Sequence, residues 1–274
     1  MTTVAKAGIR HVLIEAGARE LLFSLICVGF INAQYIRLAR QFDRDGIVNA
    51  FAATFGISLV VWVAAFAVLQ LIAKSKPCSL SRWDLAVLGV ASLFFLSPVT
   101  AMSALALTMI AVNFAVFGKS DEIRRAMRLL LALAGAVMWG RLAFSFFLPY
   151  ILQADASLAS HLTGLERTKN LIVASDGVTV LQVGAGCSSF LNVTNAALGW
   201  LTAMLYFERR FTGRAFLWLG LSMVAIIAIN TVRIGMIGWW PHYYWLIHGE
   251  IGANVTNIVS SLSIYFFAKK AAFP

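Results

Sequence analysis

The sequence predicts an all-α polytopic membrane protein, and composition is the first reason. Of its 274 residues, 60% are hydrophobic and only 12% are charged, and the mean hydropathy is +0.82. Soluble domains carry about a quarter charged residues, so we expect lipid to be the solvent of this chain. The net charge of +10 would suit nucleic acid, but the Lys and Arg residues fall between apolar segments and form no single basic patch. We therefore predict one integral membrane domain, residues 1–274, that contacts membrane lipid and no nucleic acid.

The second reason is that about eight apolar segments approach the roughly 20 residues that a membrane-spanning helix needs. The third segment is short, and Ser97-Pro98 separates it from the fourth because proline interrupts a helix. The segments are approximately Leu21–Ile36, Ile47–Ala73, Leu85–Ser97, Val99–Gly118, Leu129–Leu152, Cys187–Phe207, Ala215–Trp239 and Glu250–Ala268.

The loops between these segments predict the orientation. With a cytoplasmic N-terminus, the cytoplasmic side carries 15 Lys and Arg residues and the outer side carries 5. Because positive residues favour the cytoplasmic side, we expect both termini on the cytoplasmic face of an inner membrane. The loop from Trp239 to Trp245 has no Lys or Arg and is rich in aromatic residues, which is typical of the belt at the outer interface.

One outer segment, residues 153–186, is longer than a connection requires. Two β-rich runs in it flank Asp176-Gly177, the preferred pair for a tight hairpin turn. We expect a small extracytoplasmic β-hairpin before the sixth span, and its second strand leads directly into Gly184-Ala185-Gly186-Cys187.

Cys187 is the first candidate catalytic residue. It starts the sixth span at the outer face, where free backbone N–H groups and the helix dipole favour a thiolate, and Ser188 adds a hydroxyl beside it. The alternative interpretation is a small residue that fills a helix start. The other cysteines, Cys27 and Cys78, are interpreted as structural. Their scattered positions predict neither a zinc site nor a disulfide framework, and we expect no metal or cofactor.

Arg233 and His248 are the other two candidates. Arg233 lies inside the seventh span near its outer end, where a charged residue usually faces a polar cavity or a partner; snorkelling to the surface is the alternative. His248 opens the eighth span at the outer face, so its imidazole is the expected general base. His242 in the same loop competes for that role, and His161 and His11 are weaker candidates.

Amide side chains lie near the outer ends of the last three spans. Asn230 is three residues before Arg233 on the same helical face. Together with the other amides it is expected to form an interhelical network that holds the spans together. Arg141, in the middle of the fifth span, is expected either to pair with an acidic group such as Glu250 or to contact substrate. The remaining supporting amides are Asn192, Asn195 and Asn254.

These residues resemble the motifs of the exosortase/archaeosortase family of membrane cysteine transpeptidases. The family has a Cys-Ser-Gly at the outer start of a helix, an Asn-x-x-Arg near the end of the next, and a His with a nearby Gly opening the last. The chain has Cys187-Ser188-Ser189, Asn230-Thr231-Val232-Arg233 and His248-Gly249-Glu250-Ile251-Gly252. Ser189 stands where the family usually has Gly. The resemblance covers roughly the last 120 residues with motifs and the remainder in hydropathy and span number.

The resemblance implies a reaction and a substrate class. Cys187 would attack a backbone carbonyl to form a thioacyl-enzyme, Arg233 would stabilise the oxyanion or the thiolate, and His248 would transfer the proton. The substrates would be exported proteins that end in a sorting signal: a short motif, a transmembrane helix and a basic tail. The acyl group would then pass to an unidentified acceptor nucleophile or to water.

Two other classes remain open at the level of the sequence. A transporter would also place polar groups within spans, although the charged groups here gather at one face and no symmetry between halves is evident. A non-catalytic membrane assembly factor would keep the scaffold with an inert site. Two protease classes are disfavoured, because the chain has no H-E-x-x-H and no G-x-S-x-G motif.

Overall fold

The computed structural model describes residues 2–52, 54–77 and 79–273. The protein is predominantly helical and has a small three-stranded sheet, which confirms the all-α class. The chain divides into two compact units, Met1–Met138 and Trp139–Pro274, which are described separately. Within the described ranges, five helices are long and apolar enough to cross a membrane: Arg19–Arg44, Thr100–Phe117, Asp121–Thr163, Gly213–Trp239 and Glu250–Ala272.

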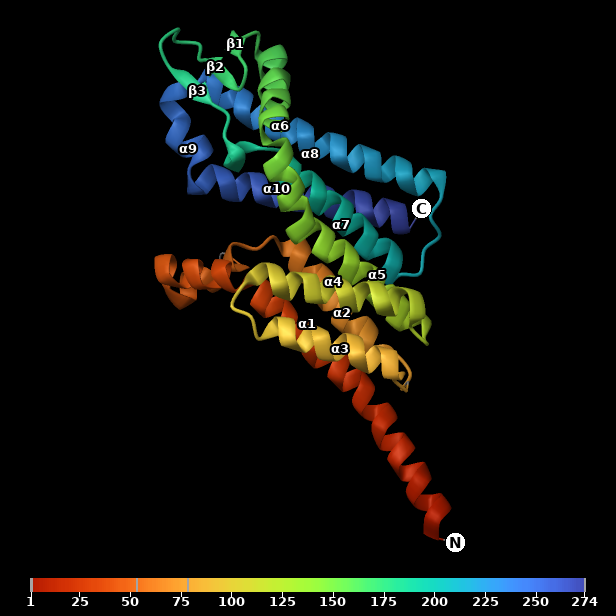
Figure 1. The fold of residues 1–274 in the computed structure, drawn as a ribbon. Coiled ribbons are helices and arrows are strands. Elements are labelled where there is room, and N and C mark those ends of the chain that lie inside the picture. Colours follow the sequence, from red (N-terminus) through yellow and green to blue (C-terminus); the bar gives the residue numbers. More distant parts are fainter. Residues whose placement is uncertain (1, 53, 78, 274) are drawn as a thin grey trace. The chain divides into compact units, whose positions relative to one another are not determined.

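Helices build the first unit (Figure 1). The turn at Ser97-Pro98 separates the third helix from the fourth, as predicted. The elements are α1 (Thr2–Ala52), a 3-10 turn (Thr54–Gly56), α2 (Leu59–Lys74), α3 (Arg82–Phe95), α4 (Thr100–Phe117) and α5 (Asp121–Ala134).

The second apolar segment is helical over a shorter range than its sequence predicts. The sequence suggests a start at Ile47, but α2 begins at Leu59. Gly46 interrupts α1 with a φ of 71°, and Phe55 and Gly56 also have positive φ values. An α-helix of L-residues cannot continue through such conformations, so the boundary is set by the backbone rather than by hydropathy.

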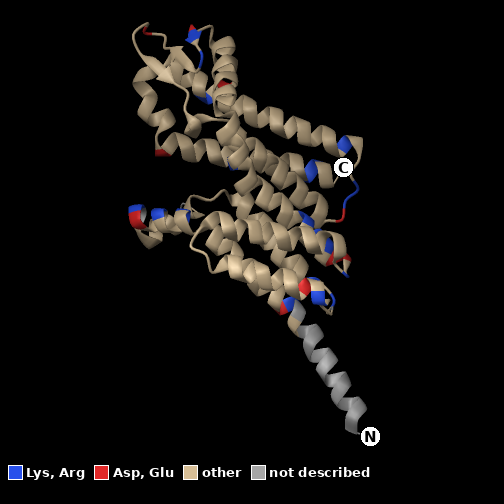
Figure 2. Cartoon of the chain, viewed as in Figure 1, with Lys and Arg blue, Asp and Glu red and all other residues tan. Residues whose placement is uncertain are grey.

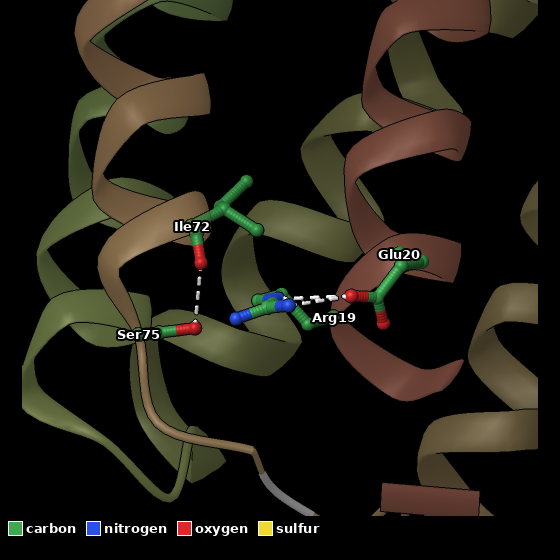
Figure 3. Close-up of polar contacts among 4 residues, drawn as sticks. All are labelled: Arg19, Glu20, Ile72 and Ser75. Carbon is green, nitrogen blue, oxygen red and sulfur yellow. Dashed lines mark hydrogen bonds and ion pairs between the residues drawn. The ribbon is translucent and has the colours of Figure 1, made fainter. Parts of the chain in front are cut away.

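The first unit is held by the buried face of α5, which contacts α2 and α4. Ile123, Met127 and Leu130 on that face are fully buried. Figure 3 shows two polar contacts of this unit, one at a helix end and one within a helix. Ser75 Oγ donates to the carbonyl of Ile72 at the end of α2 (2.7 Å), and the Arg19 guanidinium donates to the Glu20 carboxylate on α1 (2.7 and 3.1 Å).

The helix that starts with α5 continues through a π-helical turn into the second unit. The turn covers Gly135–Trp139, and α6 (Gly140–Thr163) follows it. In the second unit α7, α8 and α10 pack against one another, and α6 packs on α8. Their bounds, with the short α9, are α7 (Phe190–Tyr206), α8 (Gly213–Trp239), α9 (Tyr244–His248) and α10 (Glu250–Ala272).

The small sheet belongs to the second unit and precedes α7. Its strands pair antiparallel in the order β1 (Arg167–Thr168), β2 (Leu171–Val173) and β3 (Val180–Gln182). The loop between β2 and β3 is longer than a two-residue turn, because the Ala174 amide donates to the Thr179 carbonyl across it (2.8 Å). Within it, Asp176 accepts hydrogen bonds from two backbone amides and Gly177 takes a φ of 70°.

Two sets of contacts fix this sheet on the helices. Ile172 and Val183 are buried with Ile234 of α8 and Ala156 of α6 in one apolar cluster. Ser175 donates twice to the end of α8, from its amide to the carbonyl of Gly238 (3.0 Å) and from its hydroxyl to that of Trp239 (2.7 Å). The last carbonyls of a helix lack partners within the helix, so the hairpin loop satisfies them.

Charged residues are concentrated at helix ends and in loops in both units. Figure 2 shows the Lys, Arg, Asp and Glu positions there, while the middle parts of the helices are almost entirely uncharged. The uncharged middle sections include long exposed apolar side chains, such as Phe146, Val224 and Leu262 at 72, 63 and 62% exposure. This distribution fits helices whose middle sections are surrounded by lipid.

Candidate active site

Cys187 and His248 lie in direct contact although they are 61 residues apart in the sequence. Cys187 Sγ is 3.0 Å from His248 Nε2, and both residues are partly buried. Cys187 ends a single 3-10 turn, Ala185–Cys187, whose closing bond runs from the Cys187 amide to the Gly184 carbonyl (2.9 Å). A thiol at this distance from an imidazole nitrogen can transfer its proton to the ring.

The position of Cys187 differs from the sequence prediction in one respect. The sequence suggests that Cys187 starts the helix, but α7 begins at Phe190 and Ser189 is its N-cap. The extended backbone of Ser188 (ψ 141°) separates the 3-10 turn from α7. The amide of Phe190 is satisfied by Ser188 Oγ (3.2 Å) and that of Ser189 by Asp155 Oδ2 (3.2 Å). These two amides therefore do not face the thiol, and the helix-dipole argument for a thiolate is weakened.

Asp155 is a site residue that the sequence reasoning missed. It lies on α6, is 3% exposed, and accepts from both the amide and the hydroxyl of Ser189 (3.2 and 2.6 Å). The signal was present in the sequence: an acidic residue three positions after Leu152, where the fifth apolar segment ends. An ionisable residue at the end of an apolar span is a candidate for a functional role.

His248 is held by its own short helix. It ends α9, and the ring of Tyr244 stacks on it one turn earlier, with centroids 4.9 Å apart and planes within 10°. Burial, and then the positive charge of Arg233, lowers the pKa of His248 below its ordinary value. The imidazole is therefore neutral near pH 7, which is the form that accepts a proton. The sequence places Tyr244 only in the aromatic belt, because ring stacking cannot be inferred from composition.

Arg233 contacts the backbone that carries His248. Its Nε donates to the Ile247 carbonyl and its Nη2 to the His248 carbonyl, each at 3.3 Å. These carbonyls lie at the C-terminal end of α9, where a cation is favoured. Among the described residues, no hydrogen bond joins Arg233 to Cys187. Arg233 therefore reaches the nucleophile only through the segment that bears the base.

Asn230 is the one predicted amide that contacts the site. It is buried on α8, and its Nδ2 donates to the backbone carbonyl of Cys187 (2.7 Å). The predicted network with Asn192, Asn195 and Asn254 is not formed: these side chains make no hydrogen bond with the rest of the described chain, and Asn254 is exposed. Residue spacing predicts which helical face an amide lies on, but not which way its side chain points.

The remaining candidates lie elsewhere. Arg141 is exposed on α6 and makes no ion pair with Glu250 in the described structure. His161 contacts the carbonyl of Ser157 (2.7 Å). Cys27 is a free thiol on α1, and Cys78 and the side chain of His11 lie outside the described residues.

His242 does not compete with His248 for the thiol. It lines a cavity of about 320 Å³ between the hairpin loop and the residues that follow α8, and its ring packs on Tyr243, with centroids 4.2 Å apart. Where the chain is described, no three His, Cys, Asp or Glu side chains are grouped to hold a metal.

The site as a whole is a thiol–imidazole pair supported by three side chains from two helices, α6 and α8. Asn230 of α8 holds the carbonyl of Cys187, Asp155 of α6 holds Ser189, and Arg233 of α8 holds the end of α9. Such a pair can add to an electrophilic carbonyl and form a thioester. Comparison of the chain with protein-family models, with curated proteins and with solved structures finds no match.

Proposed function

We propose that this protein is a membrane-embedded cysteine transpeptidase or endopeptidase of the exosortase/archaeosortase kind. The observation that carries the proposal is the 3.0 Å contact between Cys187 Sγ and His248 Nε2. Two residues 61 positions apart meet through the atoms that a nucleophile and its general base use. If Cys187 were only a small residue that fills space at a helix start, a contact with an imidazole nitrogen would have no function.

The reaction follows from the chemistry of the pair. His248 Nε2 takes the proton from Cys187 Sγ as the sulfur attacks a peptide carbonyl, and the tetrahedral intermediate collapses to a thioester while the leaving amine takes that proton from the imidazolium. A second nucleophile, an amine, a hydroxyl or water, then attacks the thioester and regenerates the thiol. Arg233 donates one N–H from Nε and one from Nη2 to the α9 backbone. Of the three N–H groups that remain, we assign one on Nη1 to the developing oxyanion.

The proposed orientation places this site at the outer face of an inner membrane. About eight spans with both termini in the cytoplasm agree with the 15 to 5 distribution of Lys and Arg. The site forms where α7 starts, α8 ends and α10 starts, and these are outer ends in that orientation. Helix α6 continues to Thr163, past Leu152, where the fifth apolar segment is predicted to end. Its last turns, with Asp155, would then extend to the outer surface.

The proposed substrates are exported proteins with a C-terminal sorting signal, and the support is the motif resemblance. The chain has exposed apolar helix faces on which the transmembrane helix of such a signal could pack, for example around Phe146, Phe147 and Tyr150 of α6. The acceptor of the acyl group is an amine, a hydroxyl or water.

The test uses exported proteins of the same genome that end in a motif, an apolar helix and a basic tail. We expect the parent chain to remove that tail, measured as a mass loss of the tagged substrate, and to form a covalent adduct that hydroxylamine cleaves. Cys187→Ala should abolish both, and Cys27→Ala is the matched thiol control that should change neither. A Cys187→Ala protein that still processes the substrate would exclude a cysteine mechanism and favour a transporter or an assembly factor.

A further inference from the structure

The carboxylate of Asp155 is buried next to the nucleophile segment, and the proposed reaction does not use it. It is 3% exposed, and within the described residues its hydrogen bonds go to Ser189 alone. A buried carboxylate is costly unless its hydrogen bonds are satisfied. Asp155 contacts Ser189, which is only two residues after Cys187. We therefore looked for a function of this buried carboxylate in the site.

The backbone around Cys187 is attached to the helices at two points. Asn230 Nδ2 holds the Cys187 carbonyl from α8 at 2.7 Å. Asp155 holds Ser189 from α6, through the amide at 3.2 Å and the hydroxyl at 2.6 Å. No regular helix fixes the residues between these points, because the 3-10 turn ends at Cys187 and α7 begins at Phe190. The position of Sγ therefore depends on both attachments.

We propose that Asp155 is a positioning residue: by holding Ser189 it sets the distance between Cys187 Sγ and His248 Nε2. The inference rests on the proposed function, since it concerns the same pair. Ser188 and Ser189 are both buried, so water does not replace a lost acceptor. If Asp155 is removed, the Ser189 amide has no partner, the start of α7 shifts to find one, and the thiol moves away from the imidazole. A displacement of about 1 Å in a reacting group can cost 100-fold in rate.

The role is a geometric one, and this gives the experiment a discriminating variant. In Asp155→Asn, the side-chain oxygen can still accept from the Ser189 amide, and the Nδ2 group can donate to the Ser189 hydroxyl, which is able to accept. Asp155→Asn should therefore preserve the attachment, and Asp155→Ala should remove it. A role that required the negative charge would be lost in both variants.

The readout is the rate at which a small alkylating reagent modifies Cys187 in a protein with Cys27 and Cys78 replaced, which needs no substrate. We expect Asp155→Ala to slow alkylation about tenfold or more and Asp155→Asn to stay within about threefold of the parent. In a His248→Asn background, which lacks the base, Asp155→Ala should cause little further slowing. Asp176→Ala is the matched control. That carboxylate also accepts from amides and a hydroxyl, but in the hairpin loop, so its loss should leave alkylation unchanged.

Several results would overturn the proposal. The first is an alkylation rate in Asp155→Ala equal to that of the parent. The second is a decrease in rate as large in Asp155→Asn as in Asp155→Ala. The third is a double variant with His248→Asn whose rate falls by the full product of the two single decreases. If Asp155→Ala does not fold, Ser189→Ala tests the same attachment. It removes the hydroxyl contact but not the amide contact, so it should slow alkylation to a smaller extent, in the parent and in Asp155→Asn alike. If His248→Asn itself leaves alkylation unchanged, the thiol–imidazole pair fails and the proposed function falls with it, which is a different result from a failure of Asp155 alone.

Discussion

His248 is held on its ring and on its backbone by different residues. Tyr244 stacks on the ring, and Arg233 donates to the carbonyl of His248 itself. Among the described residues, Nδ1 of the ring has no hydrogen-bond partner. The stacked Tyr244 therefore provides the orientation that a third polar group provides in many nucleophile–base pairs.

The titration of His248 should depend on Arg233. Burial, and then the charge of Arg233, lowers the pKa of His248. The base is active when unprotonated, so activity should persist below pH 6.5 and fall as the pH passes through the lowered pKa. Arg233→Gln removes the charge and should raise that pKa, which moves the acid limb to higher pH. NMR of histidine-labelled protein measures the shift, with His242→Gln as an assignment control. An unchanged midpoint in Arg233→Gln would show that the guanidinium charge does not act on the ring.

The residues of the site were only partly predictable. Cys187, Arg233 and His248 stand out because a thiol and an imidazole at the ends of apolar segments, and an arginine inside one, lie toward the same predicted face. Asp155 was missed because its partner, Ser189, is 34 residues away, and a pattern along the chain does not indicate such a contact. The sequence wrongly predicts that Asn192 and Asn195 join the amide network at the site. Spacing along the chain gives the helical face of a residue but not the rotamer of its side chain.

At the scale of elements, the junction between α9 and α10 determines where His248 lies. A Cβ atom at Gly252 would collide with the backbone carbonyl of Ile247, the same carbonyl that accepts from Arg233 Nε. Glycine at this position thus allows the first turn of α10 to approach the end of α9 closely. The sequence indicates a His with a nearby Gly, and the structure supplies the reason for the glycine.

Gly252→Ala should therefore displace His248. The backbone of Ile247 has to move, because a carbonyl cannot rotate away as a flexible side chain can. We expect a loss of about 1–3 kcal/mol in the free energy of unfolding, typical of overpacking, together with slower alkylation of Cys187. Thermal unfolding in detergent and the alkylation rate measure the two effects. Gly220→Ala is the control, since a Cβ there meets no atom within 4 Å and alanine favours a helix. Equal behaviour of the two variants would contradict the packing argument.

Helix boundaries were less predictable than helix positions. Each predicted span overlaps a helix, because hydropathy identifies apolar segments well. The predicted starts of α2 and α7 were wrong because left-handed or extended residues interrupt the helix where hydropathy is unbroken, at Phe55 and Gly56 before α2 and at Ser188 before α7. The hairpin loop was also longer than expected, because Asp176 accepts from the amides of Val178 and Thr179 and so shapes a wider turn.

At the scale of the whole molecule, the distribution of charge is the strongest sequence signal. It predicts the membrane class and the orientation, and the long apolar helices agree with that class. The predicted single domain over residues 1–274 stays a prediction, since the structure divides at Met138 and Trp139 into two compact units. Composition does not indicate this division, because both units are rich in apolar residues.

The orientation predicts opposite sides for two positions. Lys119, between α4 and α5, should be cytoplasmic, and Lys169, between β1 and β2, should be extracytoplasmic. Alkaline phosphatase fused after Lys169 should be active and fused after Lys119 inactive, while a fluorescent protein fused at the same points should give the reverse result. A fusion after Lys270 provides the cytoplasmic control for the C-terminus. Both test fusions reporting the same side would contradict the topology and the outer location of the site.

The contacts around Cys187 also fix the order in which the site can be completed during synthesis. The thiol leaves the ribosome 43 residues before Asn230 and 61 residues before His248. Ser175 likewise leaves it 64 residues before Trp239, on which it is anchored. At about 5–20 residues per second, the interval before the base emerges is on the order of several seconds. A nascent or truncated chain that ends before α9 therefore carries Cys187 without His248, and the proposed nucleophile gains its partner only when the final helices have been synthesised.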